Sequence, residues 1–233
     1  MPETFVDWPR AYRIIASRYP PIDLFERLTP DPAVWDALIA LEMLTNPRVR
    51  DEAGQITLVP ADERVSGPGA SYVMASFTHL NPKGSRFSDG SYGVYYAAAD
   101  FETALRETVF HFEAFARDSG DPIRDEDMRV LVGTVANAFE DATSLTDAEQ
   151  AAILAPDSYG ASQAYARKLR EAGSNGILYP SVRNAGGLCV AAFKPIAVGI
   201  PTQERHIQYH WDGQRVTRYF DYATQASVPV ATL

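Results

Sequence analysis

The pattern of hydrophobic and polar residues predicts a strand, a turn and a helix in succession between Lys83 and His111. Residues 92–98 are rich in tyrosine, valine and alanine and alternate little with polar residues, which is typical of a strand buried on both faces. Asp100 is a candidate N-cap, and after it apolar residues recur at helical spacing: Ala104, Leu105, Phe112 and Phe115. We therefore expect a helix that begins at Phe101 and packs beside the strand.

The same patterns predict shorter elements in the rest of the chain. Strands are expected at 11–16, 55–59, 72–77, 129–135, 177–179, 188–193, 206–211 and 214–220. The pair Asp31-Pro32 predicts the start of a helix that ends near 46–47, with Trp35 in the core and an apolar stripe of Val34, Leu38, Leu41 and Leu44. Further helices are expected at 147–154 and 158–172, and the paired prolines at 20–21 predict an extended loop.

The order of these elements indicates the fold class. Strands stand before, between and after the helices without a regular β-α-β alternation, which is typical of an α+β fold. We expect one domain over residues 1–233. Asp212 and Gly213, between two predicted strands, are a strong hairpin signal. A C-terminal hairpin over 206–220 is therefore expected to pack on this domain.

Composition narrows the class of protein. The chain has 233 residues, of which 46% are hydrophobic, enough for a proper core. Its net charge of −9 fits a nucleic-acid surface poorly, because phosphate neutralisation needs clustered lysine and arginine. No apolar run is long enough to span a membrane and the N-terminus has no signal-peptide pattern, so a cytoplasmic protein is expected. Cys189 is the only cysteine, which excludes an internal disulfide and a cysteine-rich zinc site.

Common catalytic and metal-binding motifs are absent. The chain lacks GxGxxG, GxxxxGK[ST], GxSxG and HExxH, so dinucleotide reduction, P-loop phosphoryl transfer and hydrolase or zincin chemistry have no sequence support. His206 and His210 lie on a predicted strand, about 13 Å apart, too far to share a metal ion. Glu107 and His111 are one helical turn apart but have no evident third ligand. No metal is expected.

Three positions carry polar groups where packing alone does not require them. Glu107 lies among Thr103, Ala104 and His111 on its helix, not in a Glu/Lys ladder, so its carboxylate has a partner or a function. Arg13 lies inside a predicted strand, where the alternative is a solvated edge position. The loop PSVRNAGG, with Ser181, offers a hydroxyl and backbone N–H groups to a ligand oxygen, or is simply a hairpin loop of turn-forming residues.

Taken together, these residues resemble the RES-domain family of bacterial toxins. The resemblance runs over about residues 11–194 and rests on the following positions: Arg13 in YRI, Arg86 in GSRF, Tyr96 in VYYAAADFETALRE with Glu107 eleven positions later, and Ser181 in YPSVRNAGG. The family often has Gly-Arg-Trp where this chain has Ser85-Arg86-Phe87. The resemblance implies a fold like that of diphtheria-toxin-type ADP-ribosyltransferases, with a mixed, split β-sheet. It also implies NAD+ as substrate and the role of toxin in a type II toxin–antitoxin pair, with an Xre-like helix-turn-helix antitoxin as partner.

The residues suit that chemistry. Glu107 is placed to stabilise the oxocarbenium-like charge that develops when nicotinamide leaves ribose. The forked donors of Arg13 and Arg86 suit a pyrophosphate or an acceptor phosphate. Tyr96 supplies an aromatic face for nicotinamide, and Ser181 a donor for the nucleophile or a phosphate oxygen.

The acceptor of ADP-ribose stays open at this stage. Inorganic phosphate makes the protein an NAD+ phosphorylase, a side chain of a cellular protein target makes it a mono-ADP-ribosyltransferase, and water makes it a glycohydrolase. The alternative from another class is a non-enzymatic interaction module whose arginine, tyrosine and glutamate side chains form only a buried polar network.

Overall fold

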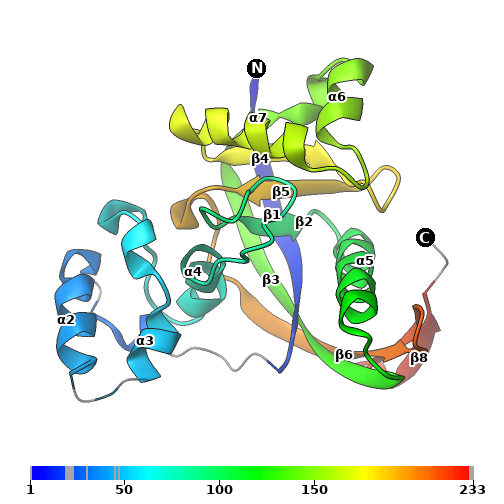
Figure 1. The fold of residues 1–233 in the computed structure, drawn as a ribbon, viewed down its shortest axis with the longest axis horizontal. Coiled ribbons are helices and arrows are strands. Elements are labelled where there is room, and N and C mark those ends of the chain that lie inside the picture. The colour runs from blue at the N-terminus through cyan, green and yellow to red at the C-terminus, as the bar shows by residue number, and fades with distance from the viewer. Residues whose placement is uncertain (1, 19–23, 30, 45, 47, 231–233) are drawn as a thin grey trace.

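The fold is built on one mixed β-sheet, seen in the computed structural model, which describes residues 2–18, 24–29, 31–44, 46 and 48–230 (Figure 1). The strand order in the sheet is β1-β2-β5-β4-β3-β6-β7-β8, and β1 also pairs with β3. The strands are β1 (Glu3–Ala16), β2 (Tyr95–Ala98), β3 (Arg124–Asp141), β4 (Gly176–Pro180), β5 (Leu188–Ala192), β6 (Thr202–Trp211), β7 (Val216–Asp221) and β8 (Ala226–Pro229). The predicted α+β class with a mixed sheet is confirmed.

The long strand β3 splits the sheet. Along one edge it pairs with β1, from Glu3↔Glu140 to Ala16↔Met128. Along its other edge, its first part is antiparallel to β6 and its end is parallel to β4. Because β1 also pairs with β2, and β2 with β5 and β5 with β4, these pairings close a ring of strands next to an open β6-β7-β8 extension.

Helices cover both faces of the strands (Figure 1). They are α1 (Leu24–Arg27), α2 (Trp35–Glu42), α3 (Arg48–Ala53), α4 (Ala70–Thr78), α5 (Phe101–Ser119), α6 (Asp147–Ile153) and α7 (Gly160–Glu171). One core cluster includes residues of α5 and α7, and the other includes residues of α1 to α4. Neighbouring strand residues alternate between the two, as Ile177 and Tyr179 lie in the first and Leu178 in the second. The central strands are therefore buried on both faces, as the sequence predicts, but the strand predicted at 92–98 is shorter and spans only Tyr95–Ala98.

Two predicted strands are wrong, because the segments are helical. Residues 55–59 contain a 3-10 turn, Ile56–Leu58, and residues 72–77 lie inside α4. Valine and aromatic residues in 72–77 favour a strand by propensity. The buried positions Ala70, Val73, Met74 and Phe77, however, follow helical spacing, and the tertiary packing of that face decides the conformation.

The apolar stripe predicted for the first helix is also wrong. Asp31 does act as an N-cap, accepting a hydrogen bond from the backbone N–H of Ala33, but the residues that α2 buries are Trp35 and Ile39. The predicted stripe of Val34, Leu38, Leu41 and Leu44 is exposed, Leu44 by 80%. The core position predicted for Trp35 is confirmed. The paired prolines 20–21 and the Pro47 helix end lie outside the described residues.

The ends of the chain add two unpredicted features. Strand β1 begins at Glu3 rather than at 11, and its register shifts between Trp8 and Ala11, so Pro9 lies at a bulge where it breaks the pattern. The C-terminal hairpin of β6 and β7 is confirmed, with Gly213 at a φ of 96° in its turn, and β8 extends it.

In the part of the chain that the structure describes, no helix is both long and apolar enough to cross a membrane.

Candidate functional site

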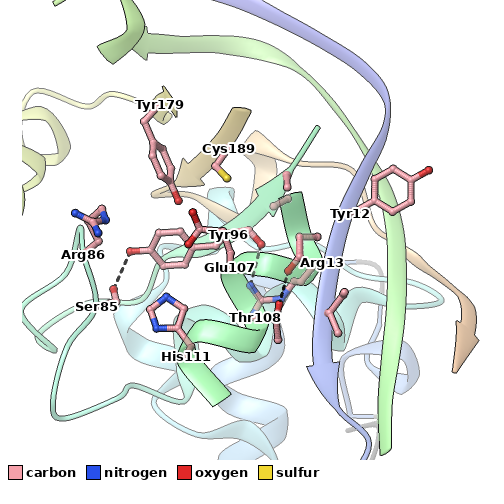
Figure 2. A pocket seen from close by; sticks show the side chains of 14 residues that line it. Tyr12, Arg13, Ser85, Arg86, Tyr96, Glu107, Thr108, His111, Tyr179 and Cys189 are labelled. Atoms are coloured by element: carbon pink, nitrogen blue, oxygen red, sulfur yellow. Dashed lines mark hydrogen bonds between the residues drawn. The ribbon is translucent and has the colours of Figure 1, made fainter. Parts of the chain in front are cut away.

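A cavity of about 230 Å³ opens beside β2 and α5 (Figure 2). Four of the predicted site residues line it: Arg13, Arg86, Tyr96 and Glu107. The fifth, Ser181, is not part of the cavity lining but donates a hydrogen bond of 2.6 Å from its Oγ to Glu107 Oε1. Residues from the start, the middle and the end of the chain thus meet at one site.

Helix α5 places one side of the cavity. The side chain of Asp100 accepts a hydrogen bond of 2.8 Å from the Thr103 N–H, the N-cap that the sequence predicts. This cap sets the start of the helix, so that residues at helical spacing face the same way. Ala104, Glu107, Thr108 and His111 all line the cavity.

The loop after β4 orients the Glu107 carboxylate. Ser181 Oγ donates to Glu107 and accepts from the backbone N–H groups of Arg183, at 3.1 Å, and Asn184, at 2.9 Å. These amides, expected to hold a ligand oxygen, are therefore used inside the turn. Ser181 positions the carboxylate instead of forming an open oxygen-binding loop. Gly187 keeps the loop against α5, since a Cβ there would meet Thr103 Oγ1 at 2.3 Å.

The Tyr96 hydroxyl holds the segment that carries Arg86. It makes a hydrogen bond of 2.8 Å with Ser85 Oγ and accepts one of 3.1 Å from the Phe87 N–H. Burial raises the pKa of Tyr96 to about 12, so the hydroxyl keeps its proton at neutral pH. Phe87, where the family often has tryptophan, is fully buried with its ring centre 5.0 Å from that of Tyr179. The chain therefore keeps a buried aromatic side chain next to Arg86, as in the family pattern.

Arg13 points from β1 toward β2, not into solvent. Its Nη1 donates to the Tyr96 carbonyl at 3.0 Å and its Nη2 to Ser76 Oγ at 3.1 Å. The guanidinium carbon lies 4.7 Å from the centre of the Tyr95 ring, and burial lowers the Arg13 pKa. The solvated-edge alternative is wrong. Within the described residues no carboxylate pairs with Arg13, and its buried Nε has no hydrogen bond.

Sequence reasoning missed several residues of the cavity wall. They are Tyr12, Ser85, Thr108, His111, Tyr179 and Cys189 (Figure 2). Helical spacing of one turn is the signal for His111, from Glu107, and for Thr108, from Ala104, whereas Tyr179 and Cys189 face the cavity only because of how β4 and β5 pair. Burial raises the pKa values of Tyr179 and Cys189, so both groups stay protonated at neutral pH and the thiol is a poor nucleophile.

The described residues contain no group of three or more histidine, cysteine, aspartate and glutamate side chains arranged to hold a metal ion.

Comparisons with known proteins bear on the same residues. The RES domain family matches residues 62–212, a stretch that includes Arg86, Tyr96, Glu107 and Ser181 but not Arg13. The chain is 28% identical over 216 residues to uncharacterized protein y4oC of Sinorhizobium fredii, covering 91% of this chain and 86% of that protein. A chain in the crystal structure of the M. tuberculosis MbcT–MbcA toxin–antitoxin complex aligns with a TM-score of 0.47 and 13% identity, covering 88% of this chain and 87% of that one. Because the family match covers more than half of the sequence, the protein belongs to the RES domain family.

Proposed function

We propose that the protein cleaves the bond between nicotinamide and ribose in NAD+ and acts as the toxin of a toxin–antitoxin pair. The observation that carries this proposal is the convergence of Glu107, Arg86 and Tyr96 on one cavity, with Ser181 hydrogen-bonded to the carboxylate. Membership of the RES domain family supports it.

In this reaction the protein has to hold the substrate in position and to stabilise the charge that develops on the ribose. When the glycosidic bond breaks, its electron pair leaves with the nicotinamide nitrogen, which becomes neutral, so no general acid is needed. Positive charge develops on the ribose, where Glu107 stabilises it. Ser181 holds Oε1, while Oε2 accepts no hydrogen bond from the described residues and is free for the sugar. An acceptor then attacks the same carbon and takes the ADP-ribosyl group.

The size of the cavity sets how much of the dinucleotide enters. Pockets that enclose a drug-sized ligand have volumes of roughly 300–1,000 Å³, and this cavity has about 230 Å³. It therefore takes the nicotinamide ribose end, between the Tyr96 ring and Glu107, while the phosphates and adenosine lie toward the mouth. Arg86, which also lines the cavity, binds the phosphates in this proposal.

The open cavity favours an enzyme over a purely structural network. A buried polar network that only holds a core has its groups paired with one another around filled space. Here Glu107 and Arg86 border an open volume, and the partner that accepts a hydrogen bond from Arg86 among the described residues is a neutral carbonyl, that of Ala155. This arrangement leaves charge available for a ligand.

The direct test is to incubate the purified protein with NAD+, with and without inorganic phosphate, and to identify the products by mass. Release of nicotinamide supports the proposal in every case. ADP-ribose 1″-phosphate identifies phosphate as acceptor, an added ADP-ribose mass on a protein from a cell lysate identifies a protein target, and free ADP-ribose identifies water. Intact NAD+ under all conditions, with folded protein, contradicts the proposal.

The toxin role is tested in cells. Expression without a partner should stop growth and lower cellular NAD+, and Glu107→Gln should do neither. An Xre-like helix-turn-helix antitoxin, the partner implied by the family resemblance, should restore both growth and NAD+ when co-expressed. Normal growth and NAD+ content in cells that accumulate the folded wild-type protein would contradict a toxin role.

A further inference from the structure

Arg183 is a second arginine near the proposed phosphate position that the sequence does not single out. It follows Ser181 in the loop after β4, and it is half-buried. Its guanidinium carbon lies 3.3 Å from the centre of the Phe110 ring, and its Nη2 donates a hydrogen bond of 2.8 Å to the Pro156 carbonyl. Phe110 directly precedes His111, which lines the cavity. Arg183 therefore packs on α5 beside a residue of the cavity wall, and its charge acts on His111.

Arg86 and Arg183 converge on the same backbone segment. Arg86 Nη1 donates a hydrogen bond of 2.9 Å to the Ala155 carbonyl, and Arg183 binds the carbonyl of the next residue, Pro156. The guanidinium of Arg86 also lies 4.7 Å from the centre of the Tyr159 ring. Both carbonyls belong to the connection between α6 and α7, so the two positive charges are held at neighbouring residues of one short segment.

The charges of this pair are not neutralised by protein carboxylates. Among the described residues neither Arg86 nor Arg183 takes part in a salt bridge, although the chain holds 30 aspartate and glutamate residues against 21 lysine and arginine residues. Arg86 is only 8% exposed, so water does not replace the missing counter-charge. Neutral carbonyls are weaker acceptors for a guanidinium than ionised oxygens are. Two neighbouring arginines that lack a carboxylate partner stabilise a bound anion.

The two guanidinium groups have enough N–H donors to bind that anion while they keep their hydrogen bonds to the loop carbonyls. A guanidinium has five N–H donors, and each of these two uses one of them in a hydrogen bond to a described residue. The aromatic rings of Tyr159 and Phe110 hold the guanidinium planes, so the forks keep their orientation when a ligand arrives. Both charges also act on His111: burial lowers its pKa, and the charges of Arg183 and Arg86 lower it further against the opposite effect of Glu107.

We propose that Arg183 and Arg86 form a two-arginine clamp that binds a phosphate group at the rim of the cavity. This inference rests on the proposed function and adds Arg183 to its binding residues. The phosphate belongs either to the diphosphate of NAD+ or to inorganic phosphate as acceptor of ADP-ribose, and the chemistry of recognition is the same for both.

The test is calorimetric titration of the purified protein with ADP-ribose and, separately, with inorganic phosphate. We compare wild type with Arg183→Gln and with Arg170→Gln. Arg170 is a matched control, because its guanidinium also packs on an aromatic ring, 4.7 Å from the centre of Tyr92, and Arg170 does not line the cavity. Loss of a hydrogen bond to a charged group weakens binding roughly ten- to hundredfold. That loss is expected for Arg183→Gln and not for Arg170→Gln.

The pattern of loss identifies the source of the phosphate. A loss for ADP-ribose alone assigns the clamp to the dinucleotide, and a loss for inorganic phosphate assigns it to the acceptor. Unchanged affinity of Arg183→Gln for both probes overturns the inference, as does a wild type that binds neither. If Arg183→Gln is unfolded by circular dichroism, Arg183→Lys replaces it, since lysine keeps the charge but not the fork. A severalfold loss is then expected, and wild-type affinity overturns the inference.

This result separates the inference from the proposed function. A wild type that cleaves NAD+ while Arg183→Gln binds both probes normally overturns the clamp alone. A wild type that binds the probes through Arg183 but leaves NAD+ intact overturns the proposed function alone.

Discussion

Replacement of Glu107 by glutamine is the perturbation whose effect follows most directly from the site. Glutamine keeps the shape of the side chain and can accept the hydrogen bond that Ser181 Oγ gives to Oε1 at 2.6 Å, so the loop after β4 should stay in place. Only the negative charge facing the ribose is lost. The folded structure and its stability are therefore expected to change little.

The expected size of the effect comes from that charge. A carboxylate about 4 Å from a unit positive charge, near a protein surface with an effective dielectric constant of about 20, stabilises it by about 4 kcal/mol. Because about 1.4 kcal/mol corresponds to a tenfold change in rate, Glu107→Gln should slow nicotinamide release roughly a thousandfold. The assay is the rate of nicotinamide formation from NAD+ at saturating substrate, followed by chromatography.

A control on the same helix makes the comparison specific. Glu102 is mostly exposed, with 52% of its side chain accessible, and pairs with Arg106 at 2.7 Å one turn along α5. Glu102→Gln removes an equal charge outside the cavity and should leave the rate within about twofold of wild type, since exposed ion pairs contribute little. If the wild type is active and Glu107→Gln loses less than about tenfold, Glu107 does not carry the chemistry and the mechanism is wrong.

Three further predictions concern the parts that hold the site. Gly187→Ala places a Cβ 2.3 Å from Thr103 Oγ1, so urea denaturation should show that the free energy of unfolding falls by about 1–3 kcal/mol, and NAD+ cleavage should be slower. An unchanged midpoint of the urea transition would show that contact with Thr103 does not hold the loop. Asp100→Ala removes the N-cap of α5 and should lower the unfolding free energy by about 1 kcal/mol, whereas no loss would exclude the cap as a determinant of the helix start. Burial raises the pKa of Tyr96 to about 12, whereas an unfolded tyrosine ionises near pH 10. The contribution of Tyr96 to the unfolding free energy should therefore hold steady up to about pH 10 and fall from there to pH 12. The fall should be smaller in Tyr96→Phe than in wild type, and an equal fall would refute the contribution of Tyr96.

Local signals in the sequence predict the parts of the site that depend on local structure. The Asp100 cap and the apolar spacing after it predict α5, and this helix alone places Glu107, Thr108 and His111 on one face. The motifs that carry the family resemblance then predict which distant residues join Glu107. Spacing along the chain cannot show their convergence, because it arises from the pairing of β1, β2 and β5.

The misses have physical causes of the same kind. Segment 70–78 contains residues that favour strands, and only its packing against the sheet makes it a helix. The first half of β1 is missed because Pro9, at a bulge, interrupts the alternation of apolar and polar residues along the strand. Arg183 lies in a loop of turn-forming residues, and its contacts with Phe110 and Pro156, which are distant in the sequence, cannot be predicted from local pattern. In each case a tertiary contact decides what the local pattern leaves open.

The measurement that tests the central claim most directly is a crystal structure of the Glu107→Gln variant grown with NAD+. The nicotinamide ribose should lie in the cavity between Tyr96 and residue 107, with the diphosphate at the rim near Arg86. Dinucleotide bound at another surface, or an unchanged cavity in crystals from a solution in which the variant is shown to be saturated with NAD+, would contradict the claim that these residues form an NAD+ site.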